Sequence, residues 1–117
     1  MKGVLLVNLG SPDSTKTNDV RDYLDEFLMD ERVIDLPKWL RTFLVKGIIL
    51  KTRPKKSAKA YRKIWWKEGS PLIVLSKRLQ NNVQKNVSVP VELSMRYGNP
   101  SIKAGLIALN KLGVDDV

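Results

Sequence analysis

The stretch VLLVNLGSP, residues 4–12, decides the fold class. Its apolar run does not alternate with polar residues, which is typical of a parallel strand buried on both faces. The run ends in a turn rich in residues that break regular structure, around Gly10 and Pro12. A helix is expected to begin at Thr17 or Asn18, because either side chain can cap the first free N–H groups. A buried strand followed by a helix predicts an α/β fold.

The expected helix carries one stripe of apolar residues at helical spacing: Val20, Tyr23, Leu24, Phe27 and Leu28. We expect this stripe to pack in the core against the strand. Similar patterns predict a second strand over residues 91–95 and helices over residues 36–50, 57–66, 71–86 and 102–112. Pro54 is expected to close the 36–50 segment, and Ser70 and Asn99 are expected to cap the last two helices.

This order of elements predicts a parallel sheet joined by crossover helices. Two strands alone make a poor sheet, since independent stability usually needs three or more. Residues 113–117 stand where a third strand would begin. The chain is therefore expected to be part of an α/β lobe that is incomplete here, and we expect its uncovered strand edges to make the isolated chain self-associate.

Composition excludes several kinds of chemistry. The 117 residues fit one small domain, and they include no Cys and no His. Disulfides, thiolate or imidazole metal sites, and catalysis by His or Cys are therefore excluded within these residues. The absence of Cys fits a reducing cytoplasm, and neither a targeting segment nor a membrane-spanning run is expected.

The formal net charge of +9 is concentrated in one region. Eight acidic and three basic residues lie between Asp13 and Asp35, whereas eleven basic residues and no acidic one lie between Lys38 and Lys67. This basic region is consistent with a solvated face, or with a site for an anion, an anionic lipid surface or nucleic acid. Its apolar segment at residues 36–50 is consistent with a core helix, a membrane-interfacial helix or the lip of a pocket for a large flat ligand.

Five stretches in fixed order carry a family resemblance: VLLVNLGSPD (4–13), DVRDYLDEFL (19–28), RVIDLP (32–37), RPKKSAKAYRKIW (53–65) with GSPL (69–72), and SMRYGNP (94–100). Together they resemble the N-terminal part of bacterial ferrochelatase, which inserts ferrous iron into a porphyrin in haem synthesis. The resemblance implies two doubly wound α/β lobes that face each other across a cleft. Residues 1–117 would be the N-terminal part of the first lobe, with a lip of the porphyrin cleft at about residues 36–56.

The resemblance also implies roles for single residues. Those matching positions that contact the porphyrin propionates are Arg53, Lys56, Tyr61 and Ser70, while Leu9 would face the macrocycle, Arg96 and Tyr97 would line the pocket, and the lip would be formed by Trp39, Phe43, Leu44 and Ile48. An apolar, aromatic segment with cations suits a flat apolar ring that carries carboxylates on one edge. Other interpretations stay open: a helix cap for Ser70, core packing for Tyr61 and the lip, and an ion pair with a packed aromatic ring for Arg96 and Tyr97.

The resemblance places the catalytic His and its partner Glu beyond residue 117, so no catalytic residue and no metal ligand is expected in this chain. The chain alone is expected to be inactive, with no resident cofactor; Fe²⁺, reaching the site through the second lobe, and porphyrin would be substrates of the full enzyme. We expect a cytoplasmic protein, with peripheral contact at the inner membrane through residues 36–50. The alternative function is a basic module without catalysis that binds a membrane or nucleic acid, although no nucleic-acid-binding motif occurs.

Overall fold

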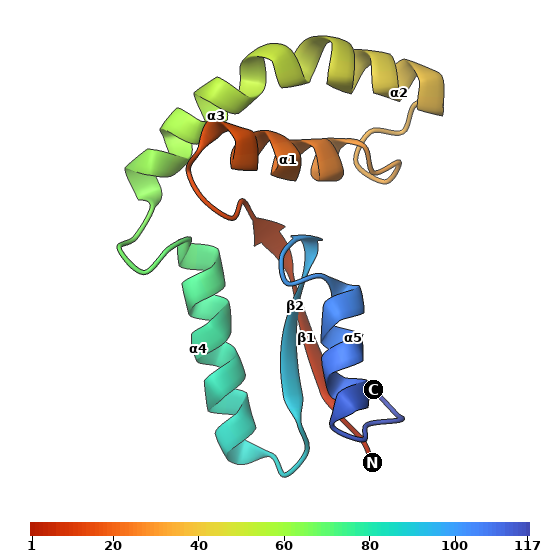
Figure 1. Ribbon diagram of the computed structural model, residues 1–117, viewed down its shortest axis with the longest axis vertical. Coiled ribbons are helices and arrows are strands. Elements are labelled where there is room, and N and C mark those ends of the chain that lie inside the picture. The colour runs from red at the N-terminus through yellow and green to blue at the C-terminus, as the bar shows by residue number, and fades with distance from the viewer. The chain divides into compact units, whose positions relative to one another are not determined.

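The computed structural model describes residues 1–117 (Figure 1). Their elements, in order along the chain, are β1 (Val4–Ser11), α1 (Thr17–Leu28), α2 (Lys38–Leu44), the π-helix η1 (Val45–Ile49), α3 (Leu50–Ile64), α4 (Pro71–Asn86), β2 (Val91–Gly98) and α5 (Ile102–Lys111). Two compact units result, one of residues 1–11 with 71–117 and one of residues 12–70. The α/β class and the incomplete parallel sheet expected from the sequence are confirmed.

The first unit is built on β1 and β2, which pair in parallel from Val4↔Val91 to Ser11↔Gly98. Helices α4 and α5 lie on opposite sides of the two strands (Figure 1). The buried apolar side chains of this unit are Val91, Leu93, Met95, Tyr97, Leu109 and Val114. β2 is thus buried along most of its length. β1 was expected to be buried on both faces, but this is wrong for this structure, because Val4–Leu6 are half-buried and Val7–Leu9 are exposed.

The last residues of the chain begin a second parallel pairing, between a third strand and the residues directly before β1. Lys2 pairs with Asp116 in parallel, and the Gly3 N–H donates to the Asp116 carbonyl at 2.8 Å. The next N–H along the strand, that of Val4, donates to Pro90 on the β2 side at 2.9 Å. Successive N–H groups of a strand point to opposite edges, so β1 lies between β2 and the 115–117 segment. The third strand expected after residue 113 is therefore started, while self-association of the isolated chain stays a prediction.

The second unit consists of two layers of helix. Helices α2, η1 and α3 follow one another without a break and curve over α1 (Figure 1). The buried side chains at this packing are Val20, Tyr23, Arg41, Val45, Leu50, Pro54 and Ala58. The expected break between residues 50 and 57 is wrong, because Pro54 lies inside α3. Proline is tolerated near the first turn of a helix, and Pro54 is the fifth residue of α3, directly after the wide π turn of η1.

Two expected helix caps also differ from those observed. The last helix is capped by Ser101, whose side chain accepts from the Ala104 N–H, and not by Asn99. The N-cap position of α1 is Lys16, which makes no side-chain cap, and Asn18 instead accepts a hydrogen bond from Arg21. Several residues near the start of a helix have side chains that could cap it. The one that does so must have non-helical backbone angles, which depend on the preceding turn.

We predict that Gly105→Ala destabilises the protein although alanine is the better helix former. A Cβ at residue 105 would lie 2.1 Å from Ser94 Oγ and 2.7 Å from Leu5 Cδ1. Overpacking of this kind costs about 1–3 kcal/mol, to be measured as a loss in the free energy of unfolding by urea. Gly47→Ala is the matched control, because its Cβ meets only Phe43 ring atoms at 3.7 and 3.9 Å. Equal effects of the two substitutions would contradict the close packing of α5 on the sheet.

Candidate functional site

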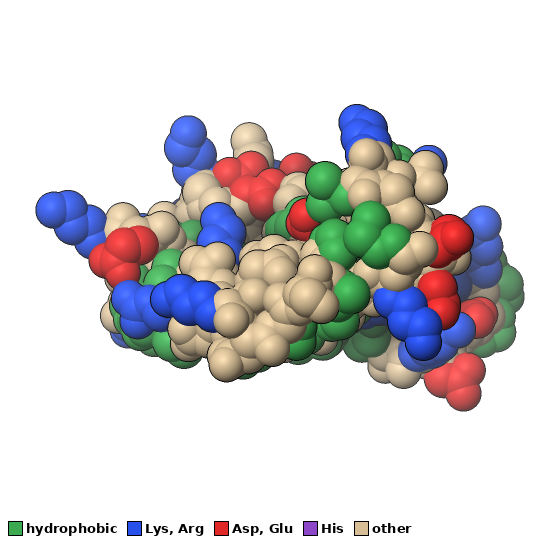
Figure 2. Space-filling model, turned by 90° about the horizontal axis from the view of Figure 1, so that it is seen from below, with side chains coloured by type: hydrophobic (Ala, Val, Ile, Leu, Met, Phe, Trp, Pro, Cys, Tyr) green, Lys and Arg blue, Asp and Glu red, His purple; other side chains and the backbone are tan.

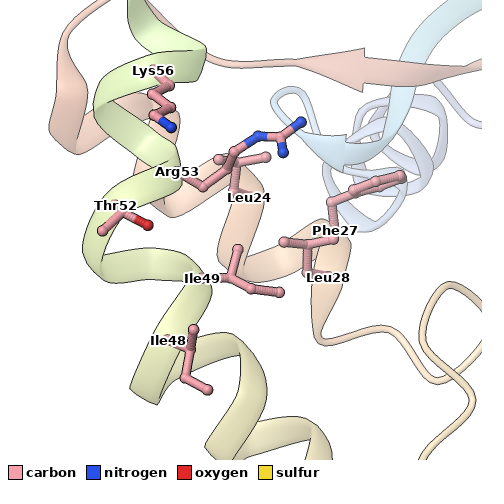
Figure 3. Close-up of a pocket in the computed structure, with 8 residues that line it drawn as sticks. All are labelled: Leu24, Phe27, Leu28, Ile48, Ile49, Thr52, Arg53 and Lys56. Atoms are coloured by element: carbon pink, nitrogen blue, oxygen red, sulfur yellow. The ribbon is translucent and has the colours of Figure 1, made fainter.

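The second unit contains a cavity of about 440 Å³ between α1 and the η1–α3 helix. Figure 3 shows the eight residues that line it: Leu24, Phe27 and Leu28 from α1, Ile48 and Ile49 from η1, and Thr52, Arg53 and Lys56 from α3. Its volume is typical of a small-molecule site. The cavity combines side chains far apart in sequence because α1 packs against both η1 and α3.

The walls and the rim of this cavity differ in chemistry. Five of the lining side chains are apolar, while Arg53 and Lys56 lie three residues apart on α3 and direct their charged ends toward the same end of the cavity (Figure 3). Arg53 Nε donates to Ser57 Oγ at 3.4 Å, and neither cation takes part in an ion pair. A ligand that suits this arrangement has an apolar body and an anionic edge.

A second, smaller hollow of about 250 Å³ lies further along α3. It is lined by Ser57, Ala60, Tyr61 and Ile64. Spacings of three and four residues place these side chains on the same helix face as Arg53. The Tyr61 ring also meets Trp65 edge to face, with centroids 6.1 Å apart. Tyr61 therefore does not line the cavity with Arg53 and Lys56, but continues the same face of α3.

Burial raises the pKa of the Tyr61 phenol, because the charged phenolate is disfavoured away from water. The hydroxyl therefore remains protonated at neutral pH and can donate a hydrogen bond to an anionic acceptor.

The carboxyl end of β1 forms a separate feature in the first unit. Gly10 has φ +124°, and a Cβ there would lie 1.9 Å from the Tyr97 carbonyl oxygen. Only glycine permits this close approach of β1 to β2. β1 lies between β2 and the start of the third strand, so the order of the sheet reverses at this point, where open α/β sheets bind their ligands. Leu9, directly before Gly10 at this end of β1, is 50% exposed.

The other residues expected at the site are placed as follows. Tyr97 is buried, and the Arg96 guanidinium lies 4.8 Å from its ring centroid. This matches a packed aromatic ring, with a cation–π contact as one partner of Arg96. Ser70 is also buried, directly before the first residue of α4, and lines neither hollow.

The expected lip is largely exposed. Trp39, Phe43 and Ile48 are 73%, 63% and 51% exposed, and of the four expected lip residues only Ile48 lines the cavity. Core packing is therefore excluded for these three side chains in this structure. Leu44 is half-buried.

Sequence reasoning missed the contribution of α1 to the cavity. The apolar stripe of α1 was expected to pack in the core against the strand. Instead α1 packs against α3 within the second unit, only Val20 and Tyr23 are buried, and Leu24, Phe27 and Leu28 form the cavity wall. Ile49 and Thr52 were missed as well. The sequence offers no signal that separates the two sets, because the buried residues and the cavity residues of α1 share one ordinary helical stripe.

Comparison with known proteins gives one consistent family. The ferrochelatase family model matches residues 1–117. Ferrochelatase of Azotobacter vinelandii is 62% identical over 112 residues, which are 95% of this chain and 33% of that protein. Ferrochelatase of Pseudomonas syringae pv. tomato is 58% identical over 115 residues, 97% of this chain and 34% of its own length. The chain thus spans about a third of the length of the curated relatives it matches.

We predict that Tyr61→Phe reduces the loss of stability at alkaline pH. Because the pKa of Tyr61 is raised in the folded state, folding favours the protonated phenol. Stability is therefore complete below the ordinary tyrosine pKa of about 10 and declines as the pH rises through it. Urea unfolding between about pH 8 and pH 11 should show a steeper decline for the wild type than for the variant. Parallel curves would contradict the effect of burial on Tyr61.

Proposed function

The chain belongs to the ferrochelatase family, and we propose that it supplies the porphyrin-holding wall and lip of an enzyme that inserts ferrous iron into a porphyrin. The observation that carries this proposal is the cavity with apolar walls and two cations, Arg53 and Lys56, at one end. A porphyrin of the protoporphyrin type has a flat apolar ring and two propionates on one edge. The two parts of the ligand thus match the two parts of the cavity.

Within this proposal, α3 holds the edge of the porphyrin. The Arg53 fork can bind one carboxylate through two parallel hydrogen bonds, and Lys56 provides a point charge for the other. Tyr61, further along the same face, is a protonated donor that extends this row. The ring itself would lie against Leu24, Phe27 and Ile49.

The reaction exchanges two pyrrole protons for one Fe²⁺. This chain has no His, so an imidazole proton acceptor must come from outside residues 1–117. The contribution of the residues described here is to bind and orient the macrocycle. We propose that Leu9, Arg96 and Tyr97 contribute from the end of the sheet and Ser70 from the end of the second unit, as the family pattern implies.

We predict that Arg53→Ala in the complete protein raises the KM for a dicarboxylate porphyrin by roughly tenfold or more, because the charge-assisted contact with one carboxylate is lost. Lys56→Ala should act in the same direction. The matched control is Lys55→Ala, since Lys55 is exposed on the same helix but lines neither hollow.

The esterified porphyrin separates binding of the propionates from a general loss of structure. Wild type and Arg53→Ala should bind the diester equally, because it carries no carboxylate. An unchanged KM for the diacid, or an equal loss for diacid and diester, would overturn the assignment of Arg53.

A second proposal concerns a membrane surface. The exposed Trp39 and Phe43 precede a ridge of exposed cations on α3, namely Lys51, Lys55, Lys59 and Lys63, none of which is in an ion pair. The face seen from below carries basic, acidic and hydrophobic side chains mixed together (Figure 2). Aromatic side chains next to cations favour contact with an anionic lipid surface. None of the helices has the length and apolar character needed to cross a bilayer.

We predict that the complete protein sediments with vesicles containing phosphatidylglycerol, and that Trp39→Ala with Phe43→Ala reduces the bound fraction at least severalfold. The control pair is Leu75→Ala with Leu79→Ala, since these α4 side chains are also more than half exposed, at 52% and 56%. Equal binding of both double variants would contradict a membrane contact at α2.

A further inference from the structure

Pro54 leaves a carbonyl without its usual helical partner. In an α-helix the N–H of residue 54 would donate to the carbonyl of Leu50, but proline has no N–H. Leu50 is 8% exposed and Pro54 is fully buried, so the freed carbonyl lies in a region with little access to water. An unsatisfied buried carbonyl is unfavourable, and a partner from elsewhere in the fold is expected.

Arg21 of α1 provides that partner. Its Nε donates to the Leu50 carbonyl at 3.4 Å, and its Nη1 donates to Asn18 Oδ1 at 2.8 Å. The second hydrogen bond, one turn earlier on α1, holds the guanidinium in place. The Arg21 guanidinium of α1 thus donates to the backbone carbonyl of α3 that lacks its usual N–H donor because residue 54 is proline.

This contact joins the two helices, α1 and α3, that form walls of the cavity. Leu24, on the α1 wall, follows Arg21 by three residues, and Arg53, on the α3 wall, follows Leu50 by three. A second contact, between Asp25 and Lys46, is long at 4.0 Å and partly exposed, so it contributes little. The contact between Arg21 and Leu50 is the shorter of these two polar contacts between the walls.

We propose that Arg21 is a positioning residue: by satisfying the carbonyl that Pro54 frees, it sets the spacing of the two cavity walls and hence the place of Arg53. This rests on the proposed porphyrin function of the cavity. Arg21 is not among the residues that line the cavity, so it acts through the backbone of α3.

The test is a double-mutant cycle in the complete protein. Arg21→Gln should raise the porphyrin KM on the order of fivefold and leave kcat nearly unchanged, because it disturbs the position of a binding group. Pro54→Ala restores an N–H for the Leu50 carbonyl. In that background Arg21→Gln should no longer change KM. Pro54→Ser is used in the same way should Pro54→Ala fail to fold.

The control is Arg62→Gln, which removes a comparable hydrogen bond from Arg62 Nη1 to the Thr15 carbonyl, 3.3 Å long, away from the cavity lining. This variant should keep the wild-type KM. An effect of Arg21→Gln that is equal in the wild-type and Pro54→Ala backgrounds would overturn the proposal, and so would no effect in the wild type.

A readout without porphyrin keeps this proposal distinct from the proposed function. The four proteins of the cycle are the wild type, Arg21→Gln, Pro54→Ala and the double variant. Their urea unfolding should show that Arg21→Gln lowers the free energy of unfolding only when Pro54 is present. If that coupling is found while Arg53→Ala leaves porphyrin binding unchanged, the role of Arg21 at the Leu50 carbonyl is supported and the assignment of the cavity to a porphyrin is wrong. If the effects of Arg21→Gln and Pro54→Ala on the free energy of unfolding simply add, the proposed role of Arg21 is wrong.

Discussion

Parallel pairing of β1 with β2 is the constraint on which the rest of the structure depends. Two parallel strands cannot be joined by a tight turn, because the chain must first return to the end of the sheet at which the first strand began. Everything between Ser11 and Val91 is therefore one crossover connection. Most such connections are a single helix, and here α4 alone would suffice to return the chain. Residues 12–70 are an addition to that crossover, and this addition contains the cavity.

Helix α3 has three faces with different surroundings. One face, with Leu50, Pro54 and Ala58, is buried against neighbouring helices. A second face carries Arg53 and Tyr61 into the two hollows. The remaining face is the ridge of lysines at intervals of four residues, from Lys51 to Lys63. Helical periodicity separates the three sets, so one helix can pack against its neighbours, line two hollows and expose a basic face at the same time.

The sequence allows the fold to be predicted further than the site. Both strands and the start of the third follow from the apolar runs and turn residues, because these are local signals. Pro54 was misleading, since the wide π turn before it is not visible in the residue pattern. The residues of α1 that form the cavity wall could not be distinguished from its core residues in the sequence, because Leu24 and Val20 fit the same helical spacing. Which of them is covered depends on how α3 packs against α1. Arg53 and Lys56 were found through the family pattern, and the structure brings them to one cavity.

The absence of acidic residues between Lys38 and Lys67 has a physical consequence for that cavity. Unpaired cations on one helix repel each other, and this repulsion opposes folding. Exposure limits the cost, because water and salt screen charges beyond about 8–10 Å. The apolar walls of the cavity reduce the screening between an anionic ligand and the two cations that line it, Arg53 and Lys56. The binding of a dianion there should therefore weaken as the ionic strength rises.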